Sequence, residues 1–436
     1  MKNKKKSPWA WIPTLYVAEG LPNVTIMAVS VALYTKMGLS NTDIAFYTSL
    51  LYLPWVIKSF WSPFVDILKT RRRWILVTQL LIGAGFAGVA FSIPTSFFLQ
   101  STIAFFYLLA FSSATHDIAA DGFYMLGLDN NQQSAFVGIR NAFYRVATLI
   151  GQGALLYLAG HLERITGNVK FAWSTTFFAM AGLFVLFSIY HRFALPKPAE
   201  DVPKSDLKSA DIVSEFFETF ISFFKKPHIF IALFFMLTFR FAEAQLQKLI
   251  IPFLDAPLAK GGLGLSMEDI GIVYGTVGII ALMLGGIIGG VVVSRGGLKK
   301  WLLPMTLSMI LTCLAFVFLS FTQPQNLLII NIAIVVEQFG YGFGFTAYML
   351  FLIYFSVGER KTSHYAICTG IMALGLVLPG MFAGWLQDLW GYQNFFLWVM
   401  IGGLIPLVAA FLVRKKMLGT SKNVVSTALN DRSSGG

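Results

Sequence analysis

Charged residues are scarce in this chain. Only 12% of its 436 residues are Asp, Glu, Lys or Arg, whereas a soluble domain carries about 25%. The hydrophobic fraction is 56%, and phenylalanine alone occurs 42 times. This combination excludes an ordinary soluble enzyme and a disordered regulator, because both need more charge than is present. It indicates a protein embedded in a lipid bilayer.

Cysteine and histidine are also rare, with two and five residues respectively. Cys313 and Cys368 both lie in apolar stretches, so neither a zinc spacing nor a disulfide framework is indicated. No P-loop, nucleophile elbow or H-E-x-x-H motif occurs. The letters G-x-G-x-x-G at 83–88 lie in an apolar run without a preceding strand, so close helix packing explains them better. We therefore expect no enzyme, no metal and no cofactor, and energy from an ion gradient, most simply of protons.

Long apolar runs dominate what is present. Crossing the hydrocarbon core takes about 20 apolar residues, and twelve segments meet this requirement. The predicted fold class is an all-α membrane protein with twelve transmembrane helices. The segments lie at about 9–35, 43–68, 74–94, 97–126, 134–159, 171–193, 228–256, 267–293, 301–321, 325–355, 363–386 and 392–413.

The basic residues indicate the orientation of these spans. Lys and Arg outnumber Asp and Glu by 33 to 21. The short loop after the second span contains Lys69 and three consecutive arginines at 71–73, whereas loop 94–96 has no basic residue. The positive-inside rule then places both termini in the cytoplasm. The excess positive charge is a signal of topology, so we expect no nucleic-acid partner.

The polar segment 194–227 divides the chain into two halves. It begins with three prolines and continues as an amphipathic, phenylalanine-rich run that is typical of a helix lying at the membrane interface. We predict a six-helix bundle at 1–193, a cytoplasmic linker at 194–227, a second, pseudo-symmetric six-helix bundle at 228–413 and a disordered cytoplasmic tail at 414–436. This is the plan of a monomeric carrier with its substrate site between the halves. A receptor or membrane enzyme with many spans is the alternative.

Two acidic residues close the fourth span. Asp117 and Asp121 are four residues apart and therefore share one helix face. Two carboxylates that are close together in a low dielectric cannot both ionise cheaply, which makes one of them a candidate proton carrier. Arg140 and Arg145, near the start of the fifth span, are the candidate counter-charges. The alternative is that these four residues form ion pairs whose role is only structural.

Further polar residues interrupt the spans. Ionisable groups inside a membrane are costly, so they are functional candidates by default. Together they would suit a large polar ligand that carries hydroxyls, amides and carboxylates, and the tyrosines could stack on sugar rings. The predicted ligand-binding residues are Tyr16, Glu19, Asn23, Tyr144, Arg240, Glu243, Gln247, Glu337 and Tyr341.

Two short cytoplasmic loops, at 61–73 and 289–300, occupy equivalent positions in the two halves. Each combines small residues or proline with a run of basic residues. Charge pairs that form in only one conformation bias a two-state equilibrium, which makes these loops candidate gates. The predicted gating residues are Lys58, Asp66, Arg71, Arg72 and Arg295. Ordinary topology anchors are the alternative reading.

Several stretches resemble the AmpG muropeptide permeases of the major facilitator superfamily. They are VAEGLP at 17–22, IKSFWSPFVD at 57–66 with RRRW at 71–74, AFSSATHDIAAD at 110–121, and Tyr144-Arg145 followed by Gly151 and Gly153. The resemblance covers about the first 155 residues.

That resemblance implies a proton-coupled importer of the bacterial inner membrane that works by alternating access. Its cargo would be GlcNAc–anhydroMurNAc, with or without peptide, for cell-wall recycling, and Asp117 and Asp121 would be its functional acids. His116 stands where those permeases usually have Gln, and Glu19 where a small residue is common. The alternatives are another amino-sugar oligosaccharide, an acyl-CoA or siderophore as cargo, or a membrane receptor that transports nothing.

Overall fold

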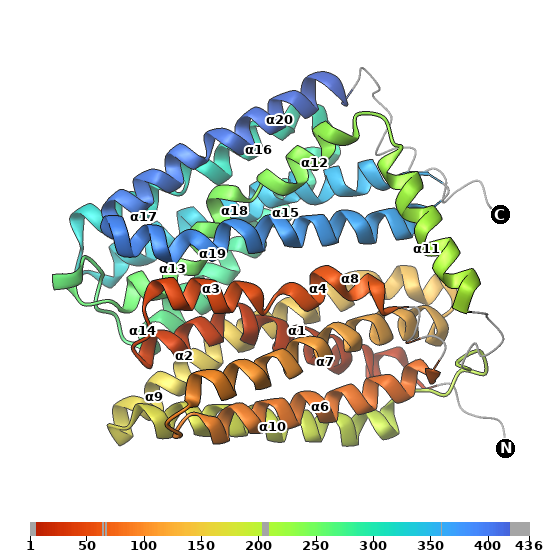
Figure 1. Cartoon of the computed structure of the whole chain (residues 1–436), viewed down its shortest axis with the longest axis horizontal. Coiled ribbons are helices and arrows are strands. Elements are labelled where there is room, and N and C mark those ends of the chain that lie inside the picture. The colour runs from red at the N-terminus through yellow and green to blue at the C-terminus, as the bar shows by residue number, and fades with distance from the viewer. Residues whose placement is uncertain (1–5, 63–64, 66–67, 203–208, 359, 419–436) are drawn as a thin grey trace. The chain divides into compact units, whose positions relative to one another are not determined.

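The structure is a computed structural model, which describes residues 6–62, 65, 68–202, 209–358 and 360–418 (Figure 1). Over these residues it consists of helices and their connections, with no β-strand. The chain divides into two compact units. Unit 1 comprises Met1–Leu39, Tyr47–Val213 and Ser266–Thr276, and unit 2 comprises Ser40–Phe46, Ser214–Leu265 and Val277–Gly436. The domain boundaries predicted at 193, 227 and 413 stay a prediction.

The helices of the N-terminal part follow one another with short connections. They are η1 (Pro8–Ala10), α1 (Ile12–Val24), η2 (Thr25–Val29), α2 (Ser30–Lys36), α3 (Asn41–Leu50), α4 (Leu53–Ile57), η3 (Lys58–Phe60), α6 (Arg71–Ser92), α7 (Phe98–Gly127), α8 (Asn130–Thr148), η4 (Leu149–Leu155), α9 (Leu156–Thr166) and α10 (Val169–Ala194).

The C-terminal part has the same character. Its helices are α11 (Ser209–Phe224), α12 (Ile229–Thr238), α13 (Phe241–Asp255), η5 (Leu258–Lys260), α14 (Met267–Ile272), η6 (Val273–Gly278), α15 (Ile279–Gly296), α16 (Leu298–Leu311), α17 (Leu314–Thr322), α18 (Leu327–Ser356), α19 (Lys361–Gly402) and α20 (Leu404–Lys416).

Many of the described helices are long and apolar. Ten stretches of the described residues are long and apolar enough to span a bilayer. One of them, Ser363–Lys416, is 54 residues long and is divided by Gly391, whose φ of 73° is not helical. It is therefore long enough for two crossings. α3 and α4 are two short helices with a turn at residues 51–52 between them.

Side-chain caps fix where several spans begin. Thr70 accepts a hydrogen bond from the Arg73 amide at the start of α6, and Asn168 accepts one at the start of α10. Asp129 and Gln132 form a reciprocal capping box on α8. These residues satisfy amides that have no partner within the helix, so they define the boundaries locally.

Three spans contain a π-helical turn, at η2, η4 and η6. A π-turn widens the helix and is often found at functional positions. The segment of unit 1 that contains α14 packs against α9 and η4. The approach is so close that a Cβ atom on Gly275 would lie 1.9 Å from the Gln152 carbonyl oxygen. Glycine is therefore the residue that fits at position 275.

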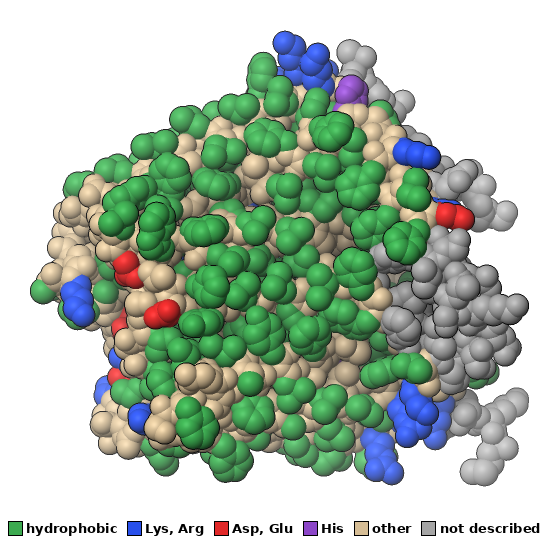
Figure 2. Space-filling view, in the orientation of Figure 1, with side chains coloured by type: hydrophobic (Ala, Val, Ile, Leu, Met, Phe, Trp, Pro, Cys, Tyr) green, Lys and Arg blue, Asp and Glu red, His purple; other side chains and the backbone are tan. Residues whose placement is uncertain are grey.

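Large apolar side chains cover the sides of the helices. Phe230 is 83% exposed, and Phe91 and Phe193 are each 68% exposed. On the face seen in Figure 2, hydrophobic side chains predominate, and the charged ones lie towards the helix ends. Such a surface is suited to lipid, because in water it would promote aggregation.

Candidate functional site

Asp117 of α7 is the centre of a buried polar group in unit 1. The Lys58 ammonium lies 3.6 Å from its Oδ2 atom, and the Trp55 indole N–H donates to the same oxygen at 2.9 Å. Its Oδ1 atom is buried and has no hydrogen-bond partner among the described residues. Lys58 was predicted as a gating residue, and the structure brings it to the predicted proton-coupling acid.

Asp121, one turn further along α7, has a cation of its own. The Arg140 guanidinium of α8 lies 2.7 Å from Asp121 Oδ1, and the Tyr16 hydroxyl donates to that oxygen at 3.4 Å. The same guanidinium stands over the rings of Tyr16 and Tyr124, at 4.6 and 5.2 Å from their centroids. The two aspartates therefore pair with different cations and do not share one.

Glu19 of α1 is within electrostatic reach of both ion pairs. Its side chain is buried, and its Oε2 atom has no partner within the described part of the chain. The charges that act on it are those of Asp121, Asp117, Arg140 and Lys58. We call these five residues the acid cluster, since three carboxyl groups face two cations. Tyr144 of α8 is within electrostatic reach of Asp117 and Glu19.

Unit 2 holds a second buried polar group. The Arg240 guanidinium donates to both carboxylate oxygens of Glu243, at 2.8 and 3.0 Å, and to the Tyr341 hydroxyl at 3.0 Å. Glu337 accepts a hydrogen bond from Gln338 at 2.8 Å. Arg240 lies where the helix is interrupted between α12 and α13. Four of the predicted ligand-binding residues therefore lie in this one group or beside it.

The other predicted ligand and coupling residues are more peripheral. Asn23 and Gln247 are half-buried, and Arg145 is exposed. Arg140 forms the ion pair with Asp121, whereas Arg145 acts electrostatically on Tyr144.

The predicted gate residues have varied surroundings. The Arg71 guanidinium occupies the space where a Cβ atom on Gly122 would stand, directly after Asp121. The Arg72 amide donates to Asp201 Oδ2 at 3.0 Å. Arg295 is exposed in the last turn of α15. Asp66 lies outside the described residues.

Several polar residues in these groups were not predicted from the sequence. They are Trp55 beside Asp117, Gln338 beside Glu337, and Gln79 and His191 in the interior of unit 1. Gln79 and His191 are polar residues within apolar runs, which is the signal that could have identified them.

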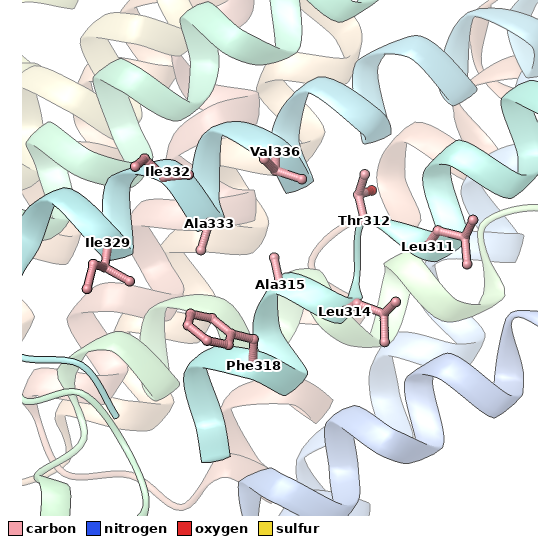
Figure 3. Close-up of a pocket in the computed structure, with 9 residues that line it drawn as sticks. All are labelled: Leu311, Thr312, Leu314, Ala315, Phe318, Ile329, Ile332, Ala333 and Val336. Atoms are coloured by element: carbon pink, nitrogen blue, oxygen red, sulfur yellow. The ribbon is translucent and has the colours of Figure 1, made fainter. Parts of the chain in front are cut away.

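A separate groove in unit 2 has a different character. It has a volume of about 510 Å³ and is lined by apolar side chains of α16, α17 and α18, with Thr312 as the polar exception (Figure 3). None of the predicted site residues lines it, so it is not the candidate site. The described residues include no group of three or more His, Cys, Asp or Glu side chains that could hold a metal.

Comparison with known proteins decides the family. The profile of the Major Facilitator Superfamily matches residues 15–364. The chain belongs to this superfamily. It is therefore a secondary transporter for a small-molecule substrate and not an enzyme, as predicted.

The most informative relatives are AmpG proteins. The chain is 28% identical over 427 residues to "Putative transporter AmpG 4" of Rickettsia conorii, covering 94% of this chain and 96% of that one. It is 25% identical over 411 residues to the "Anhydromuropeptide permease" of Escherichia coli K12, covering 93% and 79%. The resemblance seen in the first 155 residues is confirmed, and it extends through both halves.

Solved structures show the same fold. A D-xylose–proton symporter matches with a TM-score of 0.69 at 13% identity, covering 92% of this chain and 95% of that one. A bacterial homologue of the human lysosomal transporter Spinster matches with a TM-score of 0.68 at 15% identity, covering 93% and 96%. The predicted fold class, a major facilitator fold that crosses the membrane many times, is confirmed.

Proposed function

We propose that this transporter imports anhydro-muropeptides, GlcNAc–anhydroMurNAc with or without peptide, in symport with protons. It would work as a monomer in the bacterial inner membrane, with both termini in the cytoplasm, and would use alternating access. The names of the curated relatives support the cargo, and the distribution of basic residues supports the orientation.

One observation carries the coupling proposal. Asp117 is buried, has the Lys58 ammonium at 3.6 Å, and its Oδ1 atom has no hydrogen-bond partner among the described residues. A carboxyl group in this state can exchange a proton at modest cost, because Lys58 stabilises the anion while the apolar surroundings favour the neutral acid. In our mechanism Asp117 is protonated on the outer side and releases its proton inside. Arg140 holds Asp121 throughout.

The acid cluster also favours a cargo rich in hydrogen-bond donors. Glu19 Oε2 and Asp117 Oδ1 are buried acceptors that have no donor within the part of the chain that the structure describes. Sugar hydroxyls and acetamido N–H groups can satisfy them, whereas a polyanion such as an acyl-CoA would meet more carboxyl groups than cations. We therefore favour an amino sugar over the acyl-CoA alternative.

The test is uptake into liposomes that contain the purified protein. Labelled GlcNAc–anhydroMurNAc should accumulate when an inward proton gradient is imposed, and excess unlabelled disaccharide should block this accumulation. Accumulation that persists when a protonophore collapses the gradient would contradict proton coupling. Folded protein that takes up no disaccharide would contradict the cargo.

A further inference from the structure

A chain of four neutral polar side chains crosses unit 1 beside the acid cluster. Thr14 belongs to α1, Gln79 to α6, His116 to α7 and His191 to α10. Gln79, His116 and His191 are fully buried, with no exposed surface. The Thr14 hydroxyl lies 2.9 Å from His191 Nε2, and the Gln79 amide nitrogen lies 2.9 Å from His191 Nδ1 and 3.1 Å from His116 Nε2.

The hydrogen-bond chemistry assigns the state of His116. An amide nitrogen only donates, so Gln79 donates to His116 Nε2, which must be an acceptor. The proton of the neutral His116 ring is then on Nδ1, an atom with no partner among the described residues. This assignment holds for either tautomer of His191, because both polar atoms of the Gln79 amide lie near His191 Nδ1. If Nδ1 is an acceptor, the amide nitrogen donates to it at 2.9 Å, and if Nδ1 carries a proton, it donates to the amide oxygen at 3.1 Å.

His116 is the residue directly before Asp117, and the two side chains point in different directions. Successive side chains of an α-helix are about 100° apart. His116 faces Gln79 of α6, and Asp117 faces Trp55 and Lys58. Holding the His116 ring therefore helps to hold the rotation of α7 at which Asp117 faces Lys58.

Two other contacts hold α7 within a turn of Asp117: the Arg140–Asp121 ion pair and the hydrogen bond that the Trp61 indole N–H donates to Thr115. The other neighbouring positions carry small residues, Ser112, Ser113, Ala114, Ala119 and Ala120. The His116 ring is the large side chain of this turn, and its one hydrogen bond is to Gln79. A hydrogen bond between buried partners holds an orientation firmly, because breaking it leaves both groups unsatisfied.

We propose that the chain Thr14–His191–Gln79–His116 is a positioning network that holds Asp117 towards Lys58 and Trp55. Its members do not contact the cargo. They act through α7 and determine how closely the Asp117 carboxylate approaches its cation. The proposal rests on the proposed function in one respect, which is that Asp117 is the proton-exchanging acid.

The test compares Gln79→Leu with Thr78→Val, the neighbouring residue on α6. Thr78 is also buried, but its hydroxyl bonds only to carbonyls of its own helix, those of Trp74 and Ile75. A hydrophobic carbodiimide modifies protonated carboxyl groups in apolar sites. Mass spectrometry gives the midpoint, which is the pH at which half of Asp117 is modified. This midpoint depends on how closely Lys58 approaches Asp117, and it can be measured in protein that is not transporting.

In Gln79→Leu this midpoint should rise by about one pH unit, which corresponds to a tenfold change in proton affinity. It should stay unchanged in Thr78→Val. The single variant His116→Gln can still accept a hydrogen bond from Gln79 through its amide oxygen, so its midpoint should stay close to that of the wild type. The midpoint of His116→Leu, which cannot accept this bond, should rise. Thr14→Val, at the far end of the network, should give a smaller shift and provides the test if Gln79→Leu does not fold.

Transport supplies the second readout. Gln79→Leu should lower gradient-driven uptake about tenfold and leave exchange of labelled for unlabelled cargo nearly unchanged, because exchange needs no net proton transfer. A merely structural role would lower both together. An unshifted midpoint in folded Gln79→Leu, or an equal shift in Thr78→Val, would overturn the proposal. If uptake by the wild type does not depend on the proton gradient, the proposed function is wrong. The labelling midpoints would still test the positioning role in that case.

Discussion

The ion pair between Arg240 and Glu243 allows a sharp prediction of stability. Both side chains are almost entirely buried, with 8% and 3% of their surfaces exposed, and they are joined by two N–H···O bonds of 2.8 and 3.0 Å. Arg240→Met removes one partner and leaves the Glu243 carboxyl uncompensated in an apolar interior. Breaking a buried pair in this way costs about 3–5 kcal/mol.

Unit 2 provides a matched control. Arg360 and Glu218 are also joined by an N–H···O contact of 2.8 Å, but their side chains are 35% and 60% exposed. Solvent screens such a pair, so Arg360→Met should cost only about 0.2–1 kcal/mol. The shortest N···O distance is the same in the two pairs, so burial and the second Arg240–Glu243 bond account for the expected difference.

The double variant Arg240→Met/Glu243→Leu should recover most of the lost stability, because removing both charges also removes the cost of desolvating them. The assay is the free energy of unfolding in mixed micelles, titrated with SDS and followed by tryptophan fluorescence. If Arg240→Met costs no more than Arg360→Met, or if the double variant is less stable than either single variant, the reasoning is wrong. A stable double variant that no longer accumulates disaccharide would support a place for the pair in the ligand site.

Three further predictions follow from other contacts. Asp117→Asn should abolish gradient-driven uptake while exchange of labelled for unlabelled cargo continues, and driven uptake that survives would show that the proton is carried elsewhere. Gly275→Ala should lower the melting temperature in detergent, because its Cβ atom would meet the Gln152 carbonyl oxygen at 1.9 Å, whereas Gly290→Ala, with nothing within 4 Å of its Cβ atom, should not. Asp201→Asn should cost about 0.5–2 kcal/mol of unfolding free energy, because this carboxylate accepts the first two amides of α6, and an unchanged denaturation curve would contradict that role.

The sequence was sufficient to predict the helices and the family. Apolar runs of about 20 residues have few alternatives to a membrane helix, and the motifs around Asp117 are specific enough to identify AmpG relatives. The relationship of the second half was not evident from motifs, because at 28% identity the similarity is spread over 427 residues and is not concentrated in short stretches.

The pairing of charges could be predicted only in part. Arg140 was a candidate counter-charge and lies beside Asp121, but the sequence did not place Lys58 beside Asp117. Lys58 and Arg140 reach the two aspartates only because η3 and α8 pack with particular rotations and depths. Those rotations depend on side-chain packing, which hydrophobic periodicity does not specify. The buried network of Gln79 was missed for the same reason.

The π-helical turns have a consequence for how this chain can change in length. In η2, Thr25–Val29, one wide turn contains an additional residue. The angle between the directions of Glu19 before it and Tyr34 after it therefore differs from the angle in a regular α-helix. Deleting one residue there can close the wide turn to an ordinary one and leave both faces in place. The same deletion between Glu19 and η2 would turn Glu19 by about 100° relative to the rest of its helix. Single-residue gaps among homologues of this transporter should therefore fall at η2, η4 and η6 and not in the regular turns beside them.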